Sequence, residues 1–364
     1  MTTLPRGFQS HVANIGVKDD TDDFVVIATT HPVPVAGVFT RSRFAGPSVT
    51  LSRSQIADGQ ASAVVVISKN ANVATGPQGH ADAIEVAQRV AARLGCEPTD
   101  VVVTSTGVIG RRYPIDRIRS GIDALPERLT SNDATGPARG MMTTDTVPKL
   151  AEAVVAGSAA RIVGMAKGVG MIEPDMATHI SLLFTDAELS AAELDDAFRR
   201  VVDRTFNCVS VDTDTSTSDS SVIMASGAAG PVALDAFEAA LYDVAVDLTK
   251  QIARDGEGAR SLIEVHVDAA RDRSQAKCVA KNTNGKIPTM RVTDKGQVTI
   301  PKHIRDAAGI GPGSEVEFEL RDEVIVVRKR TDGPTRGRRL AERLRGRGDV
   351  EMSTDEIMAL TRGD

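Results

Sequence analysis

The chain has 364 residues, of which 41% are hydrophobic and 25% charged, the composition of an ordinary globular protein with room for two domains. Only 3% of the residues are aromatic and none is Trp, so we expect a core of Ala, Val, Ile and Leu. The sequence has no apolar run of about 18 residues, no secretion signal and no Cys-x-x-Cys pair. These absences argue against a membrane span, export and a zinc site, and the three widely spaced cysteines suit a reducing cytoplasm.

The formal net charge of −6 is unevenly distributed. From Met290 to the end, 15 Lys+Arg face 14 Asp+Glu, a net of +1, whereas the rest of the chain carries a net of −7. The change in character falls in "KNTNGKIPT", where Asn, Gly and Pro cluster as they do in linkers. We therefore expect a linker at residues 282–289 between two domains.

Apolar runs and helical periodicity alternate over the first 281 residues, which predicts an α/β protein. Strands are expected at residues 22–30, 35–40, 62–70, 101–105, 221–226 and 260–270. Helices are expected at residues 81–95, 111–129, 147–157, 191–206 and 233–256.

The pattern changes after the linker. Residues 290–301 predict two strands around a Lys-Gly turn, 302–310 a short helix, and 311–330 a hairpin with alternating apolar residues. About 40 residues of mostly β structure bury little core alone, so we expect this part to dimerise. Residues 331–364 form a basic arm with an acidic, methionine-bearing end.

The stretch "KGVGMIEPDMATHI", residues 167–180, places Thr178 between a glycine-bearing segment and an apolar run. One interpretation is a helix N-cap, worth about 1 kcal/mol. The other is that the bond between Ala177 and Thr178 breaks, which frees an α-amino group beside the threonine hydroxyl. Such an amine has an ordinary pKa of about 7.7–8.0 and can accept the hydroxyl proton near neutral pH. The short motif alone leaves both interpretations open.

Other motifs favour the second interpretation. "STGVIG" puts Thr106 and Gly107 in a turn after a strand. A hydroxyl and a backbone N–H in such a turn can form an oxyanion hole, and an ordinary glycine turn is the alternative. "RDGEGAR" offers Glu257 to an ammonium group, or as an exposed turn carboxylate. "MMTTDTVPK" and "NCVSVDTDTSTSDSS" suit an amino-acid-sized ligand, or solvated loops.

In their order and spacing, "STGVIG", "GMMTTDTVPK", "AKGVGMIEPDMAT", "TFNCVSVDTDTSTSDS" and "DGEGAR" closely resemble ornithine acetyltransferases, the glutamate N-acetyltransferases of arginine biosynthesis. The resemblance covers about residues 4–281. It implies an αββα sandwich without metal or coenzyme, and self-cleavage between Ala177 and Thr178. Residues 1–177 would form an α chain and residues 178–281 part of a β chain, which stay associated in a homo-oligomer.

The resemblance also implies the reaction and its residues. An acetyl group passes from N-acetylornithine to glutamate through an acetyl-Thr178 intermediate, with Thr106 and Gly107 as the oxyanion hole. The substrate contacts would be Thr144, Lys167, Glu257 and Thr178 itself. Some members also use acetyl-CoA, an activity that we do not assume for this sequence.

The sequence departs from the family pattern at two loop positions and in one long segment. Lys69 and Thr213 stand where most or many members have glycine. After Lys281, nothing matches the strands that complete the family's β chain and help to close its substrate site.

Residues 290–330, including "KGQVTIPKHIR", instead resemble the swapped-hairpin domain of AbrB-like regulators and VapB-type antitoxins. The resemblance implies a DNA-binding dimer in which Arg305 contacts operator DNA. Lys295 and Lys302 are added from charge and position only, and a solvated basic face is the alternative. Residues 331–364 resemble a toxin-binding arm, which would bind a PIN-domain ribonuclease.

Two hypotheses follow. The chain is a self-cleaving acetyltransferase with a regulatory appendage, or it is a DNA-binding antitoxin that carries an inactive acetyltransferase remnant.

Overall fold

The computed structural model describes residues 2–172, 179–211, 216–259, 262, 314, 316–321 and 324–329. The chain divides into two compact units, Met1–Ala269 and Ala270–Asp364, and each is described by itself. The domain boundaries expected after residues 177, 281, 289 and 330 stay predictions.

The first unit is built on an eight-stranded sheet in the order β4-β3-β2-β8-β7-β6-β5, with β1 paired to β2. Its strands are β1 (Gln9–Ala13), β2 (Phe24–Phe39), β3 (Gln60–Ile67), β4 (Val101–Ser105), β5 (Lys149–Val154), β6 (Arg161–Lys167), β7 (Ile180–Glu188) and β8 (Ser220–Pro231). Two pairs, β3–β4 and β7–β8, are parallel, and the others are antiparallel.

The long strand β2 connects the two halves of this sheet. Its first part, Phe24–Ala28, pairs with β1 and β3, and its last part, Val35–Phe39, pairs with β8. The register with β3 shifts between Ala28 and Val33, next to two prolines that donate no ladder hydrogen bond. The prediction of two separate strands at residues 22–30 and 35–40 was therefore wrong, because the chain stays extended through the prolines.

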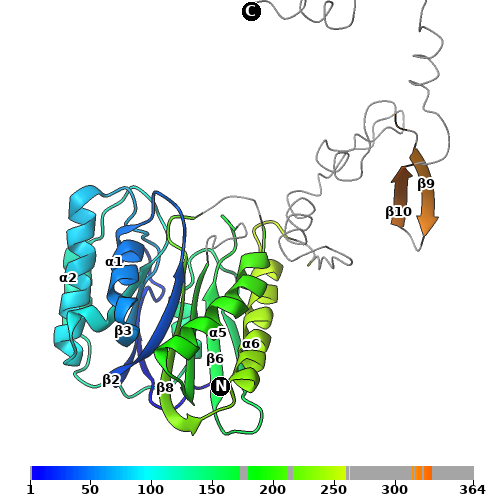
Figure 1. Cartoon of the computed structure of the whole chain (residues 1–364). Coiled ribbons are helices and arrows are strands. Elements are labelled where there is room, and N and C mark those ends of the chain that lie inside the picture. The colour runs from blue at the N-terminus through cyan, green and yellow to red at the C-terminus, as the bar shows by residue number, and fades with distance from the viewer. Residues whose placement is uncertain are drawn as a thin grey trace, which may run out of the picture. The chain divides into compact units, whose positions relative to one another are not determined.

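Three apolar clusters show that the sheet is folded into two layers. One cluster joins the outer face of β2–β3–β4 to α2 and α3, and another joins the outer face of β6–β7–β8 to α5 and α6. The third lies between the layers and combines residues such as Val64 and Val102 with Met165 and Phe184. The order is helix, sheet, sheet, helix (Figure 1), which confirms the αββα sandwich.

The α-helices of this unit are α1 (Pro47–Gln55), α2 (Gly76–Leu94), α3 (Ile115–Asp123), α4 (Thr135–Gly140), α5 (Ala191–Arg204) and α6 (Leu234–Arg254). The helices expected at 81–95, 191–206 and 233–256 are confirmed. Ser190 and Glu193 form the capping box that begins α5, and Gly95, with φ 73°, ends α2. Only Ile115–Asp123 of the expected helix 111–129 is α-helical.

The helix expected at residues 147–157 was wrong. Lys149–Val154 is the edge strand β5, paired antiparallel with β6. Its alanines favour a helix, but every second side chain packs toward the core, so tertiary burial decides the outcome.

No helix in the described part of the chain is both long enough and apolar enough to cross a bilayer.

In the second unit, β9 (Val316–Arg321) and β10 (Val324–Lys329) form an antiparallel hairpin in which Arg321 faces Val324. This confirms the expected hairpin within 311–330. The expected elements at 260–270, 290–301 and 302–310, and the arm at 331–364, lie outside the described residues, apart from Leu262.

Candidate active site

The turn after β4 holds the predicted oxyanion residues against the loop that follows β3. The Thr106 N–H donates to Ile67 O (3.3 Å), the Val108 N–H to Lys69 O (3.3 Å) and the Ala71 N–H to Val108 O (3.1 Å). Because β3 and β4 run parallel, their carboxyl ends meet at one edge of the sheet and bring these loops together.

Gly107 has no room for a side chain. Its φ is 137°, and a Cβ there would lie 2.1 Å from the Lys69 carbonyl carbon and 2.5 Å from the Asn70 nitrogen. Within the described part of the chain, the structure records no acceptor for the Gly107 N–H or for the Thr106 hydroxyl. Both donors are thus available to a ligand, as an oxyanion hole requires.

For the acetyl transfer that the motif resemblance implies, the Gly107→Ala variant is expected to be slower by a factor of about 10²–10³, because the added methyl group displaces a donor N–H. Ser120→Ala, an exposed helix residue, serves as the control and should keep the wild-type rate. Comparable initial rates of acetyl exchange in Gly107→Ala and the control would exclude Gly107 from the oxyanion hole.

The loop after β3 is strained. Lys69, Asn72 and Ala74 have φ values of 72°, 51° and 61°, a left-handed conformation that non-glycine residues rarely adopt. Such conformations cluster at functional sites. Glycine adopts this conformation without strain, so the positive φ of Lys69 gives a physical reason why glycine suits this position.

The side chain of Lys69 forms an ion pair. The Lys69 ammonium donates to Asp19 Oδ1 (2.5 Å), and this hydrogen bond holds the pKa of the Asp19 carboxyl well below its usual value.

The second half of the site lies where β6, β7 and β8 meet. Lys167 ends β6 and faces Ile180, the first residue of β7, which in turn faces Ser220 of β8. Ala177 and Thr178 lie outside the described residues, but Thr178 is bonded to His179 and stands two residues before Ile180. The segment that follows is a strand, so the helix N-cap interpretation of Thr178 was wrong.

A buried ionic cluster supports this junction. Lys149 Nζ donates to Asp145 Oδ1 (2.7 Å) and Asp255 Oδ2 (2.6 Å), and its side chain has no exposed area. Asp145 Oδ1 also accepts from the Gly168 N–H (2.7 Å), and Asp145 Oδ2 lies 4.0 Å from Lys167 Nζ. The cluster therefore ties the "TTDTVPK" loop to the end of β6 and to the end of α6.

The charges of this cluster shift several pKa values. Burial raises the pKa of the Asp145 carboxyl, but Lys167 and Lys149 outweigh burial and leave it below its usual value. Burial lowers the pKa of the Lys167 ammonium, although Asp145 opposes the shift. Burial raises the pKa of Asp219 well above its ordinary value. The pKa values of Lys167 and Asp219 are therefore shifted toward each other, and strongly shifted pKa values are typical of functional sites.

The other predicted substrate residues lie on the same loops. Thr144 is exposed and precedes Asp145, whose Oδ2 accepts from the Thr143 N–H (3.1 Å). Glu257 is exposed, and its N–H donates to Val169 O (2.6 Å), two residues after Lys167.

The connection after β2 links the two halves of the site. The Gly46 N–H donates to Thr217 O (2.8 Å), and a Cβ on Gly46 would lie 3.6 Å from Ala71 O. Ala71 belongs to the strained loop and Thr217 to the segment before β8. The oxyanion turn and the Lys167 junction therefore occupy neighbouring positions.

Sequence reasoning missed four charged residues of this site: Asp145, Lys149, Asp219 and Asp255. All four stand in or beside the hydroxyl- and glycine-rich motifs, which was the available signal. Arg305, Lys295 and Lys302 lie outside the described residues, and their role in DNA binding stays a prediction.

Comparison with known proteins gives two family matches. Residues 9–286 match the model of the ArgJ family, and residues 289–335 match the model described as antidote-toxin recognition MazE, bacterial antitoxin. The second match agrees with the antitoxin-type domain expected after residue 289.

Similar proteins cover most of the first unit. The arginine biosynthesis bifunctional protein ArgJ 2 of Nostoc sp. is 53% identical over 280 residues, 77% of this chain and 72% of that protein. The glutamate N-acetyltransferase Oat2 of Streptomyces clavuligerus is 54% identical over 278 residues, 76% of this chain and 70% of that protein. A crystal structure of ArgJ from Bacillus halodurans is 32% identical with a TM-score of 0.46, and the match covers 48% of this chain and 95% of that one.

Proposed function

The chain belongs to the ArgJ family, and we propose that it is a self-cleaving glutamate N-acetyltransferase that moves acetyl from N-acetylornithine to glutamate in arginine biosynthesis. The observation that supports the proposal is that the oxyanion turn and the Lys167 junction occupy neighbouring positions, linked by the contacts of Gly46, beside the strand that Thr178 precedes.

Thr178 is the proposed nucleophile. Cleavage of the Ala177–Thr178 bond frees its α-amine, which takes the proton from the Thr178 hydroxyl as the oxygen attacks the acetyl carbonyl carbon. The Thr106 hydroxyl and the Gly107 N–H then donate hydrogen bonds to the developing oxyanion. The α-amine returns the proton to the nitrogen of ornithine, which leaves, and acetyl-Thr178 remains.

The second half-reaction reverses the first. The neutral α-amine of glutamate attacks the ester carbonyl, and its proton passes by way of the Thr178 α-amine to the Thr178 oxygen as the ester bond breaks. The acetyl group passes between two amines without oxidation or reduction, so the proposed cycle needs no metal or coenzyme. Lys167 suits a substrate carboxylate, Glu257 suits the ammonium of the ornithine side chain, and Thr144 offers a hydroxyl between them.

The sheet explains how two cleaved chains stay together. A cut before Thr178 places β1–β6 on one fragment and β7–β8 on the other. Strand β7 pairs with β6, and β8 pairs with β2, so the second fragment supplies two central strands of the sheet. The fragments are therefore expected to separate on a denaturing gel and to co-purify under native conditions.

The test is acetyl exchange between N-acetylornithine and labelled glutamate by the purified full-length chain, run beside a denaturing gel. We expect two fragments and labelled N-acetylglutamate. Acetyl-CoA in place of N-acetylornithine tests the second donor. A single intact band without exchange would contradict the proposed function.

A second function is favoured for the C-terminal part by the MazE match and the β9–β10 hairpin. We propose that residues 289–364 bind a toxin protein, with operator DNA and a PIN-domain ribonuclease as the specific partners to test. DNA binding should weaken steeply with salt, because phosphate contacts release counterions. Arg305→Ala should then weaken operator binding in a gel-shift titration.

A further inference from the structure

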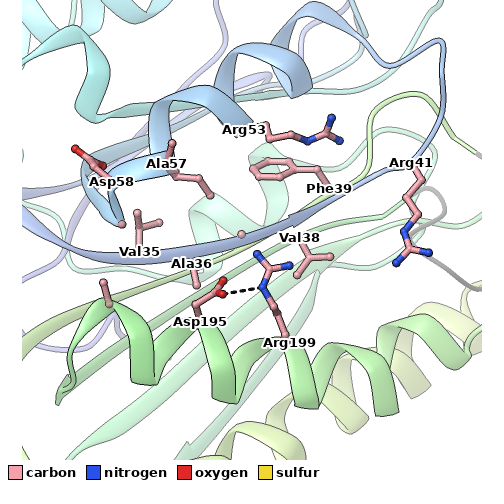
Figure 2. Close-up of a pocket in the computed structure, with 14 residues that line it drawn as sticks. Val35, Ala36, Val38, Phe39, Arg41, Arg53, Ala57, Asp58, Asp195 and Arg199 are labelled. Atoms are coloured by element: carbon pink, nitrogen blue, oxygen red, sulfur yellow. Dashed lines mark hydrogen bonds and ion pairs between the residues drawn. The ribbon is translucent and has the colours of Figure 1, made fainter. Parts of the chain in front are cut away.

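A groove runs along the last part of β2, between α1 and the beginning of α5 (Figure 2). It encloses about 700 Å³. Its apolar lining comes from Val35, Val38 and Phe39, and its charged lining comes from three arginines, Arg41, Arg53 and Arg199, and two aspartates, Asp58 and Asp195. Asp58 lies at the opposite end of the groove from Arg41 (Figure 2). None of these residues belongs to the acetyl-transfer site described above.

The floor of the groove is an edge of β2 without a strand beside it. Strand β3 pairs with β2 only as far as Pro34, and the Val35 N–H then donates to Gly59 O (3.0 Å). On the opposite edge, the Thr40 N–H donates to Asp219 O (3.1 Å). Since hydrogen-bonding direction alternates along an antiparallel strand, the N–H groups of Gly37 and Phe39 point toward the groove. No strand among the described residues pairs with them there.

The three arginines give one end of the groove a surplus of positive charge. Arg199 is paired with Asp195 (2.7 Å), but the described residues place no carboxylate within ion-pair distance of Arg41 or Arg53. Arg53 donates to Thr40 O (2.7 Å), and its guanidinium carbon lies 5.9 Å from the centre of the Phe39 ring. In Figure 2 the guanidinium groups of Arg53 and Arg199 lie on opposite sides of β2, near Phe39 and Val38.

We propose that this groove binds a small organic anion, with its carboxylate or phosphate held by Arg41, Arg53 and Arg199 and its apolar body lying along Val35–Phe39. Guanidinium groups present planar, paired donors that match both anions. The strand edge adds backbone donors, and the aromatic ring and Val38 favour a flat apolar body.

An occupant of this groove is connected to the catalytic end of the sheet by Thr40. The Thr40 carbonyl accepts from Arg53, its hydroxyl donates to Ser216 O (2.8 Å) and its N–H donates to Asp219 O. An anion that attracts the Arg53 guanidinium therefore changes the hydrogen bonding of Thr40. The groove is therefore assigned to an effector of acetyl transfer, which binds at a place distinct from the substrate site.

The test is calorimetric titration of the full-length chain with phenyl phosphate and benzoate, with inorganic phosphate and neutral benzyl alcohol as partial probes. At least one aromatic anion should bind in the millimolar range or tighter, and more tightly than either partial probe. Arg41→Gln and Arg199→Gln should each weaken it about tenfold or more. Arg200→Gln is the matched control on the same helix, where it loses a comparable ion pair with Glu238, and should bind as the wild type does.

Amide NMR signals of Thr40 and Asp219 report the connection without an activity assay. Both should shift at saturating aromatic anion in the wild type, and much less in Arg53→Gln. No binding of either aromatic anion, or equal weakening by Arg200→Gln, would overturn the site. Equal affinity for inorganic phosphate would overturn the apolar part, and unshifted Thr40 and Asp219 signals at saturation would overturn the effector role.

Discussion

Replacing Thr178 with alanine is expected to leave the purified chain as one polypeptide and to abolish acetyl exchange. Alanine has no hydroxyl to attack the preceding carbonyl, so the bond after Ala177 stays an amide and no α-amine forms. Without that nucleophile the exchange rate should fall by a factor on the order of 10⁴ or more, as it does in other enzymes that lose the attacking side chain. The denaturing gel measures cleavage and the labelled-glutamate assay measures exchange.

Thr178→Ser is the matched control, because serine keeps the hydroxyl and loses only a methyl group. It should still cleave, although with an altered rate. The Ala177→Gly variant changes the other side of the bond and leaves the nucleophile in place, so it too should cleave. Exchange at the wild-type rate in an uncleaved Thr178→Ala chain would exclude Thr178 as the acetyl carrier.

Local pattern predicted much of the first unit because its helices bury one face each. The 3.6-residue period of α2, α5 and α6 and the apolar runs of β3 and β4 match their burial in the structure. The error at Lys149–Val154 arose where local preference and tertiary burial disagree. Alanine-rich sequence favours a helix, but the pairing with β6 and the hydrogen bonds of Leu150 to the Gln251 side chain hold this segment extended.

The oxyanion turn could be predicted because its chemistry is local. Thr106 and Gly107 follow one strand directly, and the glycine conformation depends on a close approach that only this residue type permits. The cluster of Asp145, Lys149 and Asp255 could not be predicted in this way. More than 100 positions separate Lys149 from Asp255, and no periodicity links them before the sheet and α6 are assembled.

Replacing Lys149 with methionine is expected to destabilise the first unit by about 3–5 kcal/mol, because it leaves Asp145 and Asp255 without their shared buried cation. In a calorimetric scan at pH 7, the melting temperature of this unit should fall by about 10 °C. The exposed pair of Arg119 and Asp116 is the comparison, and Arg119→Gln should cost much less because Glu85 and Asp116 stay solvated.

Acid and a compensating variant separate the charge effect from packing. In the wild type, the lowered pKa values of Asp145 and Asp255 stabilise the fold above about pH 4, and this contribution is lost as pH falls through the folded-state values. In Lys149→Met both carboxyls have lost their shared cation, and Asp145 keeps only the more distant Lys167. Protonation then relieves part of the penalty, so the difference in melting temperature between variant and wild type should narrow from pH 7 to about pH 4. Adding Asp255→Asn to Lys149→Met removes the carboxylate that has lost its cation and leaves Asp145 beside Lys167, so this double variant should recover much of the melting temperature. If the difference in melting temperature stays constant with pH and is not reduced in the double variant, Lys149 acts by filling space, and the ionic account of this junction is wrong.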